Sequence, residues 1–452
     1  MQTHHIGSTA ISHTKAKPVI DMLLLEVISL ESLDQNSHPP HVNRVIAAKG
    51  HHMYISRIVP ASIIAMLLTL TNLVSAAELP YSHADESIGT VREVYDGKLY
   101  PDIQVNTFRN IDRLFPTRTV ARGETVNVLP VSDNPLQAFS YTVDDQTYDL
   151  YDVLAMNRVS GMVIIPNGEI LFEKYLVGND EHTRWMSMSV VKSMTATLIG
   201  AAIQDGHINS IDDPIVDYLP RFAGSAYDGV SVRHLLQMSS GVAWNETYTD
   251  PTSDRRRMLE AQIGQQPGAV LDLMASLPRA AEPGSRWNYS TGETQLAGAL
   301  VQAATGKPVA DYLSEKIWSK MGMEADANWW LQSPNGLEVG GSGLSATLRD
   351  YARFGLFMLN DGVINDERVL PEGWMDAAST PKVVGGETID YGYMLWPLHG
   401  RSYAAEGIFG QYVFVDPDKD LVVAMWGAQP KPIGRAGLNE YRFLQALSGF
   451  FD

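Results

Sequence analysis

Residues 159–175 read VSGMVIIPNGEILFEKY and give the first clear indication of the architecture. Two runs rich in β-branched and aromatic residues flank Asn167-Gly168, a dipeptide typical of a tight hairpin turn. Near the other end of the chain, residues 411–416 and 421–426 form two further β-rich runs around the turn PDKD. The sequence therefore predicts antiparallel strands at both ends of the main domain.

The middle of the chain carries helical signals instead. Apolar periodicity, with serine, proline or glycine at the boundaries, predicts helices over 190–204, 232–238, 294–304 and 308–321. Another helix is predicted over 438–450. Strands at both ends around a helical middle predict an α+β fold, in which an antiparallel sheet built from both ends of the domain is flanked by helices and carries an inserted α-helical lobe.

Residues 53–76 read MYISRIVPASIIAMLLTLTNLVSA, with the basic start, apolar run and small-residue end of a secretory signal peptide. An uncleaved membrane anchor is the alternative, because the apolar run is about as long as the shortest spanning helices. Cleavage is favoured, since Pro60 and several polar residues interrupt the run. We therefore expect a periplasmic or secreted protein with no stable membrane partner.

Residues 5–21, HIGSTAISHTKAKPVID, resemble the opening motif of the GrpB-like family, relatives of nucleotidyltransferases, and the resemblance ends near Asp34. So short a piece cannot bury a core or assemble a nucleotide site. We therefore expect Met53 to be the natural start and residues 1–52 to be a disordered upstream remnant. The alternative function, that of a nucleotidyltransferase, would require residues 1–52 to be translated and folded.

Composition narrows the possible activities. The 452 residues carry 34 basic and 52 acidic side chains, a net charge of −18, which disfavours binding to nucleic acid. The absence of cysteine excludes disulfides, thiolate metal sites and cysteine nucleophiles. Most of the 12 histidines fall in residues 1–52, so no metal site is expected, and no organic cofactor either.

The first candidate for catalysis is the pattern S-x-x-K at residues 189–192, SVVK. No serine has glycine at both −2 and +2, so the G-x-S-x-G turn of α/β-hydrolases is absent. A spacing of three on a helix places the Ser189 hydroxyl and the Lys192 amine on one face. Burial and the positive helix end disfavour protonated lysine, so neutral Lys192 can take the serine proton. The alternative is a capping Ser189 beside a solvated Lys192.

The second candidate is Tyr289, in the segment WNYST that follows the turn at residues 283–285. A tyrosine on such a turn can present its phenol to a cleft, where a nearby cationic lysine stabilises the phenolate and makes it a base. The alternative is a packing tyrosine whose hydroxyl is satisfied.

Several ordered blocks resemble the serine β-lactamase-like family, in the branch of class C β-lactamases, family VIII-type esterases and 6-aminohexanoate-dimer hydrolases. They are WMSMSVVKSM, VRHLLQMSSGVAWNETYTDPTSD, SRWNYSTGETQLAGALV, GGSGLSATLRDYARFGLFMLNDG and AEGIFGQYVFVDPDKDLVV. The resemblance covers most of residues 77–452 and implies a β-lactamase/transpeptidase-like fold. It also implies Ser189 as acylated nucleophile, Lys192 as its base and Tyr289 as proton shuttle toward the leaving group. We expect an arm over 77–155 and the serine hydrolase domain over 156–452.

Two motifs depart from the family pattern. Where relatives carry Lys-Thr-Gly or His-Thr-Gly, this chain reads Ala405-Glu406-Gly407, and the segment after Tyr289 lacks the asparagine of many lactamases. Both departures disfavour recognition of β-lactams and D-Ala-D-Ala. The backbone N–H groups of Ser189 and Ile408 are the expected oxyanion hole.

The leading hypothesis is an exported, cofactor-free serine hydrolase that forms an acyl-enzyme and cleaves a carboxylic ester or a small linear amide. Candidate substrate-binding residues are Tyr248, Asp254, Trp287 and Gly407, although Asp254 is equally suited to capping a turn. The alternatives are a weak β-lactamase or D-Ala-D-Ala peptidase-like enzyme, and a non-catalytic peptidoglycan-binding relative that kept the scaffold.

Overall fold

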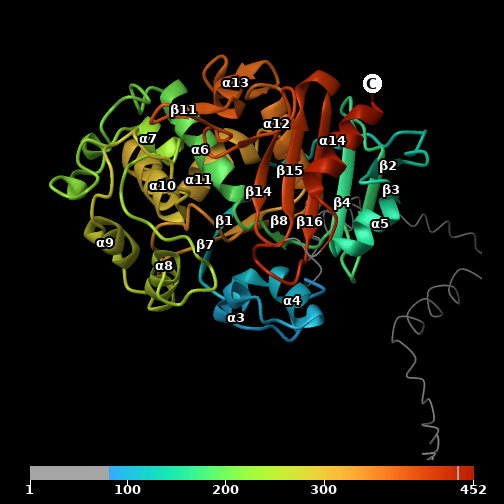
Figure 1. Ribbon diagram of the computed structural model, residues 1–452, viewed down its shortest axis with the longest axis horizontal. Coiled ribbons are helices and arrows are strands. Elements are labelled where there is room, and N and C mark those ends of the chain that lie inside the picture. The colour runs from blue at the N-terminus through green and yellow to red at the C-terminus, as the bar shows by residue number, and fades with distance from the viewer. Residues whose placement is uncertain (1–80, 435–436, 452) are drawn as a thin grey trace, which may run out of the picture. The chain divides into compact units, whose positions relative to one another are not determined.

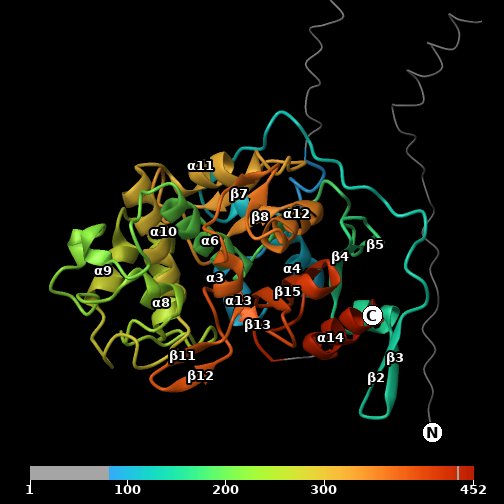
Figure 2. The same cartoon turned by 90° about the horizontal axis from the view of Figure 1, so that it is seen from above.

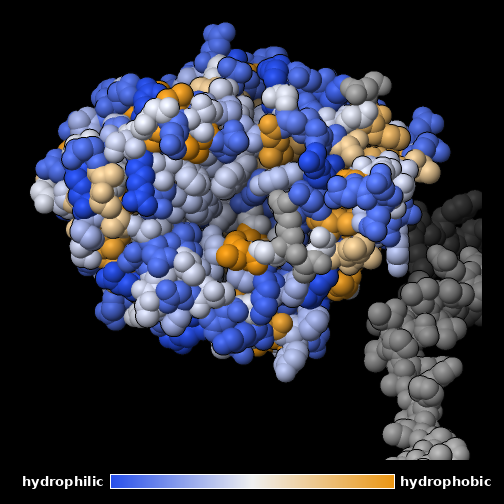
Figure 3. Space-filling view, viewed as in Figure 1, coloured by the Kyte–Doolittle hydropathy of each residue, from blue (hydrophilic) through white to orange (hydrophobic). Residues whose placement is uncertain are grey.

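The computed structural model describes residues 81–434 and 437–451 (Figure 1). The predicted remnant 1–52 and signal peptide 53–76 lie outside these residues. Leu79–Asp452 form one compact unit. Within the described part, no helix is both long and apolar enough to cross a bilayer. The face seen in Figure 3 is mostly hydrophilic, and its hydrophobic residues form small separate patches.

The main sheet has six antiparallel strands in the order β13-β14-β15-β16-β4-β5. Its strands are β4 (Val159–Pro166), β5 (Phe172–Tyr175), β13 (Trp396–Pro397), β14 (Tyr403–Gly407), β15 (Gln411–Asp416) and β16 (Leu421–Gly427). Asn167 and Gly168, with φ of 50° and 78°, make the left-handed turn after β4. The prediction of one sheet built from both ends of the domain is confirmed, because β4 pairs directly with β16.

Helices cover both faces of this sheet (Figures 1 and 2). On one face lie α6 (Val190–Gln204) and α12 (Leu348–Leu359), and on the other lie α5 (Leu150–Met156) and α14 (Glu440–Phe450). Every residue of β4 is consequently buried, with Val163 in one hydrophobic cluster and Met162 in the other. The predicted α+β class follows from this layering.

Along the chain, a helical lobe lies between strands β5 and β13 of the main sheet. In space it lies to one side of the sheet (Figure 1). It contains η2 (Ile215–Asp217), η3 (Pro220–Phe222), α7 (Val232–Leu236), α8 (Asp254–Ile263), α9 (Ala269–Ser276), α10 (Thr291–Thr305), α11 (Val309–Leu313) and η4 (Ser314–Trp318). The single helix predicted over 308–321 is wrong, because α11 gives way at Ser314 to a π-helical turn.

A second sheet has the order β1-β7-β8-β6. Its strands are β1 (Thr117–Val120), β6 (Trp185–Met186), β7 (Ala327–Trp330) and β8 (Leu344–Ala346). The segment expected as an arm is not extended throughout, since it contributes β1, α3 (Val91–Asp96), α4 (Pro101–Phe108) and η1 (Ile111–Arg113). Shorter elements complete the fold: β2 (Ser140–Val143), β3 (Gln146–Asp149), β9 (Val363–Ile364), β10 (Glu367–Arg368), α13 (Trp374–Ser379), β11 (Lys382–Val384), β12 (Glu387–Ile389) and η5 (Pro417–Lys419).

Candidate active site

Ser189 stands where strand β6 passes into helix α6. Met188, immediately before it, has a left-handed φ of 46°, an uncommon conformation for a residue with a side chain. The Ser189 side chain makes no capping hydrogen bond to α6. Its hydroxyl lies instead beside the Lys192 amine and lines a surface pocket. The alternative of a capping serine is therefore wrong.

Lys192 is buried one helical turn further on. The residue is 2% exposed, and Nζ donates to Ser189 Oγ at 2.9 Å and to the Gly341 carbonyl at 2.7 Å. The pKa of Lys192 is lowered to about 7, chiefly by burial; the charge of Glu246 opposes this shift and the charge of Arg255 adds to it. A large fraction of neutral amine near pH 7 follows, so the alternative of a solvated lysine is also wrong.

Tyr289 comes from the loop before α10. Lys192 Nζ lies 5.5 Å from its ring centroid, and Tyr289 lines the same pocket as Ser189. Burial raises the pKa of Tyr289, the charge of Glu246 raises it further, and the nearby Ser189 side chain lowers it less. The site therefore favours the phenol over the phenolate expected from the sequence. In that form Tyr289 is placed to relay a proton.

The end of β14 lies against the nucleophile. A β-carbon on Gly407 would sit 2.8 Å from the Ser187 carbonyl oxygen and 3.0 Å from Ser189 N, so only glycine allows this approach. The following turn is held by Gln411, whose Nε2 donates to the carbonyls of Gly427 at 2.7 Å and Ile408 at 3.3 Å. Ile408 and Ser189 consequently line the same pocket, where their N–H groups were predicted to meet.

The pocket has a volume of about 530 Å³. Its lining comes from the helical lobe, from strands β13 to β15, from the loop after β16 and from the starts of α6 and α14: Ser189, Glu246, Thr247, Tyr248, Tyr289, Trp396, Glu406, Gly407, Ile408, Phe409, Gly410, Tyr412, Gln429, Pro432, Ile433, Gly434 and Glu440. Three of these residues are glutamates, and none of the described lining residues is lysine or arginine. Arg435, next in sequence after Gly434, lies outside the described residues.

The predicted substrate-binding residues divide into two groups. Tyr248 and Gly407 line the pocket. Asp254 does not, because its carboxylate accepts from Asn245 N at 3.0 Å and from Arg257 at 2.8 Å at the start of α8. Trp287 stands behind the wall, with its ring centroid 6.3 Å from that of Trp396, whose ring stacks on Tyr289 at 5.9 Å.

Sequence analysis did not single out Glu246 or Tyr95. Glu246 accepts from Thr291 N at 2.9 Å, and also from Thr291 Oγ1 and Trp244 Nε1. Its position inside the block WNETYTDPTSD was the available signal. Tyr95 comes from α3 and stacks on Tyr248 at 6.3 Å, with the Arg255 guanidinium 4.2 Å above its ring. No motif marks Tyr95 in the sequence.

Comparison with known proteins gives an independent view. A family model described as Beta-lactamase matches residues 152–447, and one described as GrpB protein matches residues 1–45. The 6-aminohexanoate-dimer hydrolase of Paenarthrobacter ureafaciens is 28% identical over 346 residues, 72% of this chain and 85% of that protein. Esterase EstB of Burkholderia gladioli is 29% identical over 203 residues, 40% of this chain and 49% of that protein. A Bacillus anthracis structure, provisionally assigned as a 6-aminohexanoate-dimer hydrolase, superposes with a TM-score of 0.71 at 20% identity, covering 80% of this chain and 98% of that one.

Proposed function

The chain belongs to the Beta-lactamase family and is a serine hydrolase, and we propose that it forms an acyl-enzyme on Ser189 and cleaves carboxylic esters or small linear amides. The observation that carries this proposal is the contact between the buried Lys192 amine and the hydroxyl of Ser189, which lines a surface pocket. A non-catalytic relative would need neither the buried amine nor the hydroxyl.

Acylation follows from the positions of three side chains. Neutral Lys192 accepts the proton of Ser189 Oγ as this oxygen attacks the substrate carbonyl carbon. The N–H groups of Ser189 and Ile408 stabilise the oxyanion, and one such donor is typically worth about 3 kcal/mol of barrier. Tyr289 then gives its proton to the leaving oxygen or nitrogen, the bond to the leaving group breaks, and Lys192 returns a proton to Tyr289.

Deacylation reverses the same path. A water molecule takes the place of the leaving group, and Tyr289 and Lys192 together accept its proton while its oxygen attacks the ester carbon. The second tetrahedral intermediate is held by the same N–H groups. Its collapse returns the proton to Ser189 Oγ and releases the carboxylic acid.

The charge of the pocket supports neutral or cationic substrates over anionic ones. Glu246, which is paired with Arg255 at 3.8 Å, lines it together with Glu406 and Glu440. None of the described lining residues is a lysine or arginine that could pair with the carboxylate of a β-lactam or a D-Ala-D-Ala peptide. The names of two relatives, a 6-aminohexanoate-dimer hydrolase and an esterase, support linear amides and esters as the substrate class.

A series of p-nitrophenyl esters tests this proposal: hexanoate, 6-aminohexanoate and adipate monoester, which share an unbranched six-carbon acyl chain and end in a neutral, a cationic and an anionic group. We expect kcat/KM for the anionic ester to be at least about tenfold below the other two, because none of the described lining residues is a lysine or arginine that could pair with its carboxylate. Ser189→Ala should abolish turnover of all three, whereas Ser285→Ala, outside the pocket, should leave it unchanged. Preference for the anionic ester, or faster turnover of a chromogenic cephalosporin, would contradict the proposal. Arg435→Ala shows whether that residue alters the charge preference.

Export is also part of the proposal, on the strength of the three-part pattern in residues 53–76. Expression of the gene in a Gram-negative host, followed by fractionation and intact mass, tests it. A product beginning near Ala77 in the periplasm or medium is expected. A cytoplasmic product that retains residues 1–52 would contradict both export and the start at Met53.

A further inference from the structure

The turn formed by residues 238–242 holds both neighbours of Tyr289. Asn288 N donates to the Met238 carbonyl at 2.9 Å, and Ser290 N donates to Met238 Sδ at 3.2 Å. Met238 is fully buried and has a left-handed φ of 50°, an uncommon conformation that the surrounding structure has to stabilise. The position of the Tyr289 phenol therefore depends on this turn.

A buried carboxyl group ties the same turn to helix α10. Ser240 Oγ accepts from Val242 N at 3.1 Å and donates to Glu293 Oε1 in the first turn of α10. Glu293 N donates to Ser290 Oγ at 3.2 Å, and Ser290 directly follows Tyr289. Glu293 is 2% exposed and Ser240 is 1% exposed. The turn, the Tyr289 loop and the start of α10 thus form one hydrogen-bonded unit inside the helical lobe.

Glu293 has no counter-ion within residues 81–434 and 437–451. No lysine, arginine or histidine there forms an ion pair with it, and its Oε2 makes no hydrogen bond. Burial raises the pKa of Glu293 to about 8, and Ser240 lowers it less. At pH 7 the residue is consequently for the most part a neutral acid.

Two tyrosines face Glu293 closely enough to be affected by its charge. Burial raises the pKa values of Tyr227, ahead of α7, and of Tyr391, ahead of β13, and the charge of Glu293 raises them further. Both residues are therefore neutral phenols. Neither of them can balance a negative charge on Glu293.

The helices packed against α10 add no counter-ion either. In the described part of the chain, no cation of α6, α7 or α8 lies within 4.0 Å of the Glu293 carboxyl group, and α9 and α11 carry no cation. The cations of the first three helices are Lys192, Arg233, His234, Arg255, Arg256 and Arg257. Loss of the Glu293 proton would leave an unpaired carboxylate inside the lobe, which is costly. Opening of the first turn of α10 toward water would relieve this cost and would move Ser290 and Tyr289.

We propose that Glu293 is a positioning residue for Tyr289. As a neutral acid it accepts the hydrogen bond from Ser240 and fastens the first turn of α10 to residues 238–242, so that both neighbours of Tyr289 stay in place. Loss of its proton at alkaline pH loosens this unit and lowers kcat. This role rests on the proposed function of Tyr289 as proton donor to the leaving group.

Hydrolysis of ethyl hexanoate at pH 7, followed by pH-stat titration, tests the role of the carboxyl group. Glu293→Gln should keep kcat within about threefold of the wild type, because its amide oxygen accepts the same hydrogen bond. Glu293→Leu should lower kcat at least about tenfold and change KM by less than about threefold, because it displaces Tyr289 without touching the substrate. Ser240→Ala should cause a similar loss, and the double variant should lose no more than either single one.

The pH dependence separates Glu293→Gln from the wild type. The ratio of their kcat values, variant over wild type, should rise at least about threefold between pH 7 and pH 9.5, because only the wild type can ionise at this position. Folding raises the pKa of Glu293 from 4.5 to about 8, so between these pH values the folded chain holds the proton and the unfolded chain does not. The melting temperature of the wild type relative to Glu293→Gln should therefore fall as pH rises across this window.

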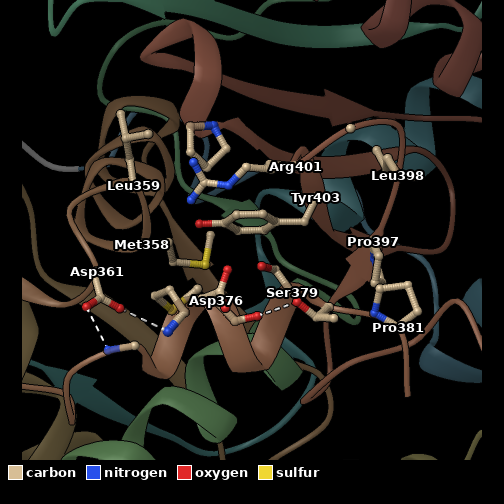
Figure 4. Close-up of a pocket in the computed structure, with 15 residues that line it drawn as sticks. Met358, Leu359, Asp361, Asp376, Ser379, Pro381, Pro397, Leu398, Arg401 and Tyr403 are labelled. Atoms are coloured by element: carbon tan, nitrogen blue, oxygen red, sulfur yellow. Dashed lines mark hydrogen bonds between the residues drawn. The ribbon is translucent and has the colours of Figure 1, made fainter. Parts of the chain in front are cut away.

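Labelling of Ser189 by a fluorophosphonate distinguishes displacement of Tyr289 from damage to the whole site, because fluoride leaves without a proton. Glu293→Leu should be labelled within about threefold of the wild-type rate. Asp376→Asn is the control for both kcat and the pH profile and should change neither. Its exposed carboxyl group lines a separate cavity beside α13 that shares no lining residue with the catalytic pocket (Figure 4).

Three results would overturn the role of Glu293: an unchanged kcat in Glu293→Leu, equal losses of kcat and labelling in that variant, or a ratio of Glu293→Gln to wild type that is constant with pH. If Glu293→Leu does not fold, the pH dependence of Glu293→Gln decides alone. Turnover of ethyl hexanoate by Ser189→Ala would instead overturn the proposed function.

Discussion

Lys192 and Arg353 are both buried cations, yet their surroundings differ completely. Arg353 is 0% exposed and lies 3.1 Å from Asp350 and 2.8 Å from Glu324, with further bonds to the Asn127 carbonyl. Lys192 is 2% exposed and contacts a hydroxyl and a carbonyl, with no carboxylate within 4.0 Å in the described part of the chain. The first cation has counter-ions and the second has none.

This difference separates a structural cation from a reactive one. A buried charge with close counter-ions stays charged and ties its partners together. A buried amine without a counter-ion loses its proton easily and becomes a base near neutral pH. The two sites should therefore respond in opposite ways when the cation is removed.

The largest expected effect is on catalysis. Lys192→Met should lower kcat/KM about 10⁴-fold or more, because the base is lost from a group of residues that act together. Its melting temperature at pH 7 should change little, since removing a buried amine that has no counter-ion offsets the loss of its hydrogen bond to the Gly341 carbonyl. Ester kinetics and differential scanning calorimetry measure both. Lys174→Met, at an exposed position, is the matched control. Loss of stability without loss of activity in Lys192→Met would show that Lys192 is a structural cation and not a reactive one.

Tyr289→Phe should lower kcat/KM about 10²- to 10⁴-fold, the usual range for removing a positioned proton donor. The Phe ring keeps the packing on Trp396, so stability should change little. A fast leaving group such as p-nitrophenolate needs protonation less than an alkoxide or amine does. Alkyl ester and amide substrates should therefore lose more activity than the p-nitrophenyl ester. An equal loss for all substrates would argue against a role in leaving-group protonation.

Arg353→Met should act on stability instead. Removing one partner of a buried ion pair costs about 3–5 kcal/mol, because the buried Asp350 carboxylate loses its counter-ion. Arg401→Met, which breaks an exposed pair with Asp418, should cost at most about 1 kcal/mol. Urea unfolding measures both changes. Ester turnover per folded molecule should be unaffected by Arg353→Met, and a large fall in kcat would show that the two cations are not separate in function.

The pH dependence gives the finest test. With a Lys192 pKa of about 7, kcat/KM should fall about tenfold for each pH unit below 7 as the amine becomes protonated. Folding depresses the pKa of Lys192 from its ordinary value of 10.5. Between about pH 7 and pH 10.5, the lysine therefore holds its proton in the unfolded chain but not in the folded one. The stability of the wild type relative to Lys192→Met should therefore rise with pH across this window. A flat difference would contradict a neutral, buried amine.

The parts of this site that sequence predicts are local ones. Ser189 and Lys192 are three residues apart, so helix geometry alone brings them together. Tyr289 is joined to them by tertiary packing of α10 on α6, and only the family resemblance linked it to the pair. Glu246 and Tyr95 reach the site from a loop and from α3, where no local pattern marks them. The strands of the sheet were predictable from hairpin turns, whereas the π-helical turn after Leu313 had no signal in the apolar periodicity.

The most direct measurement is the intact mass of purified protein after brief exposure to a fluorophosphonate, for the wild type, Ser189→Ala and Lys192→Met. We predict one adduct on the wild type, none on Ser189→Ala, and greatly slowed labelling of Lys192→Met, with all three proteins folded by circular dichroism. Absence of an adduct on the folded wild type, or labelling of Ser189→Ala at the wild-type rate, would contradict a Ser189 nucleophile activated by Lys192.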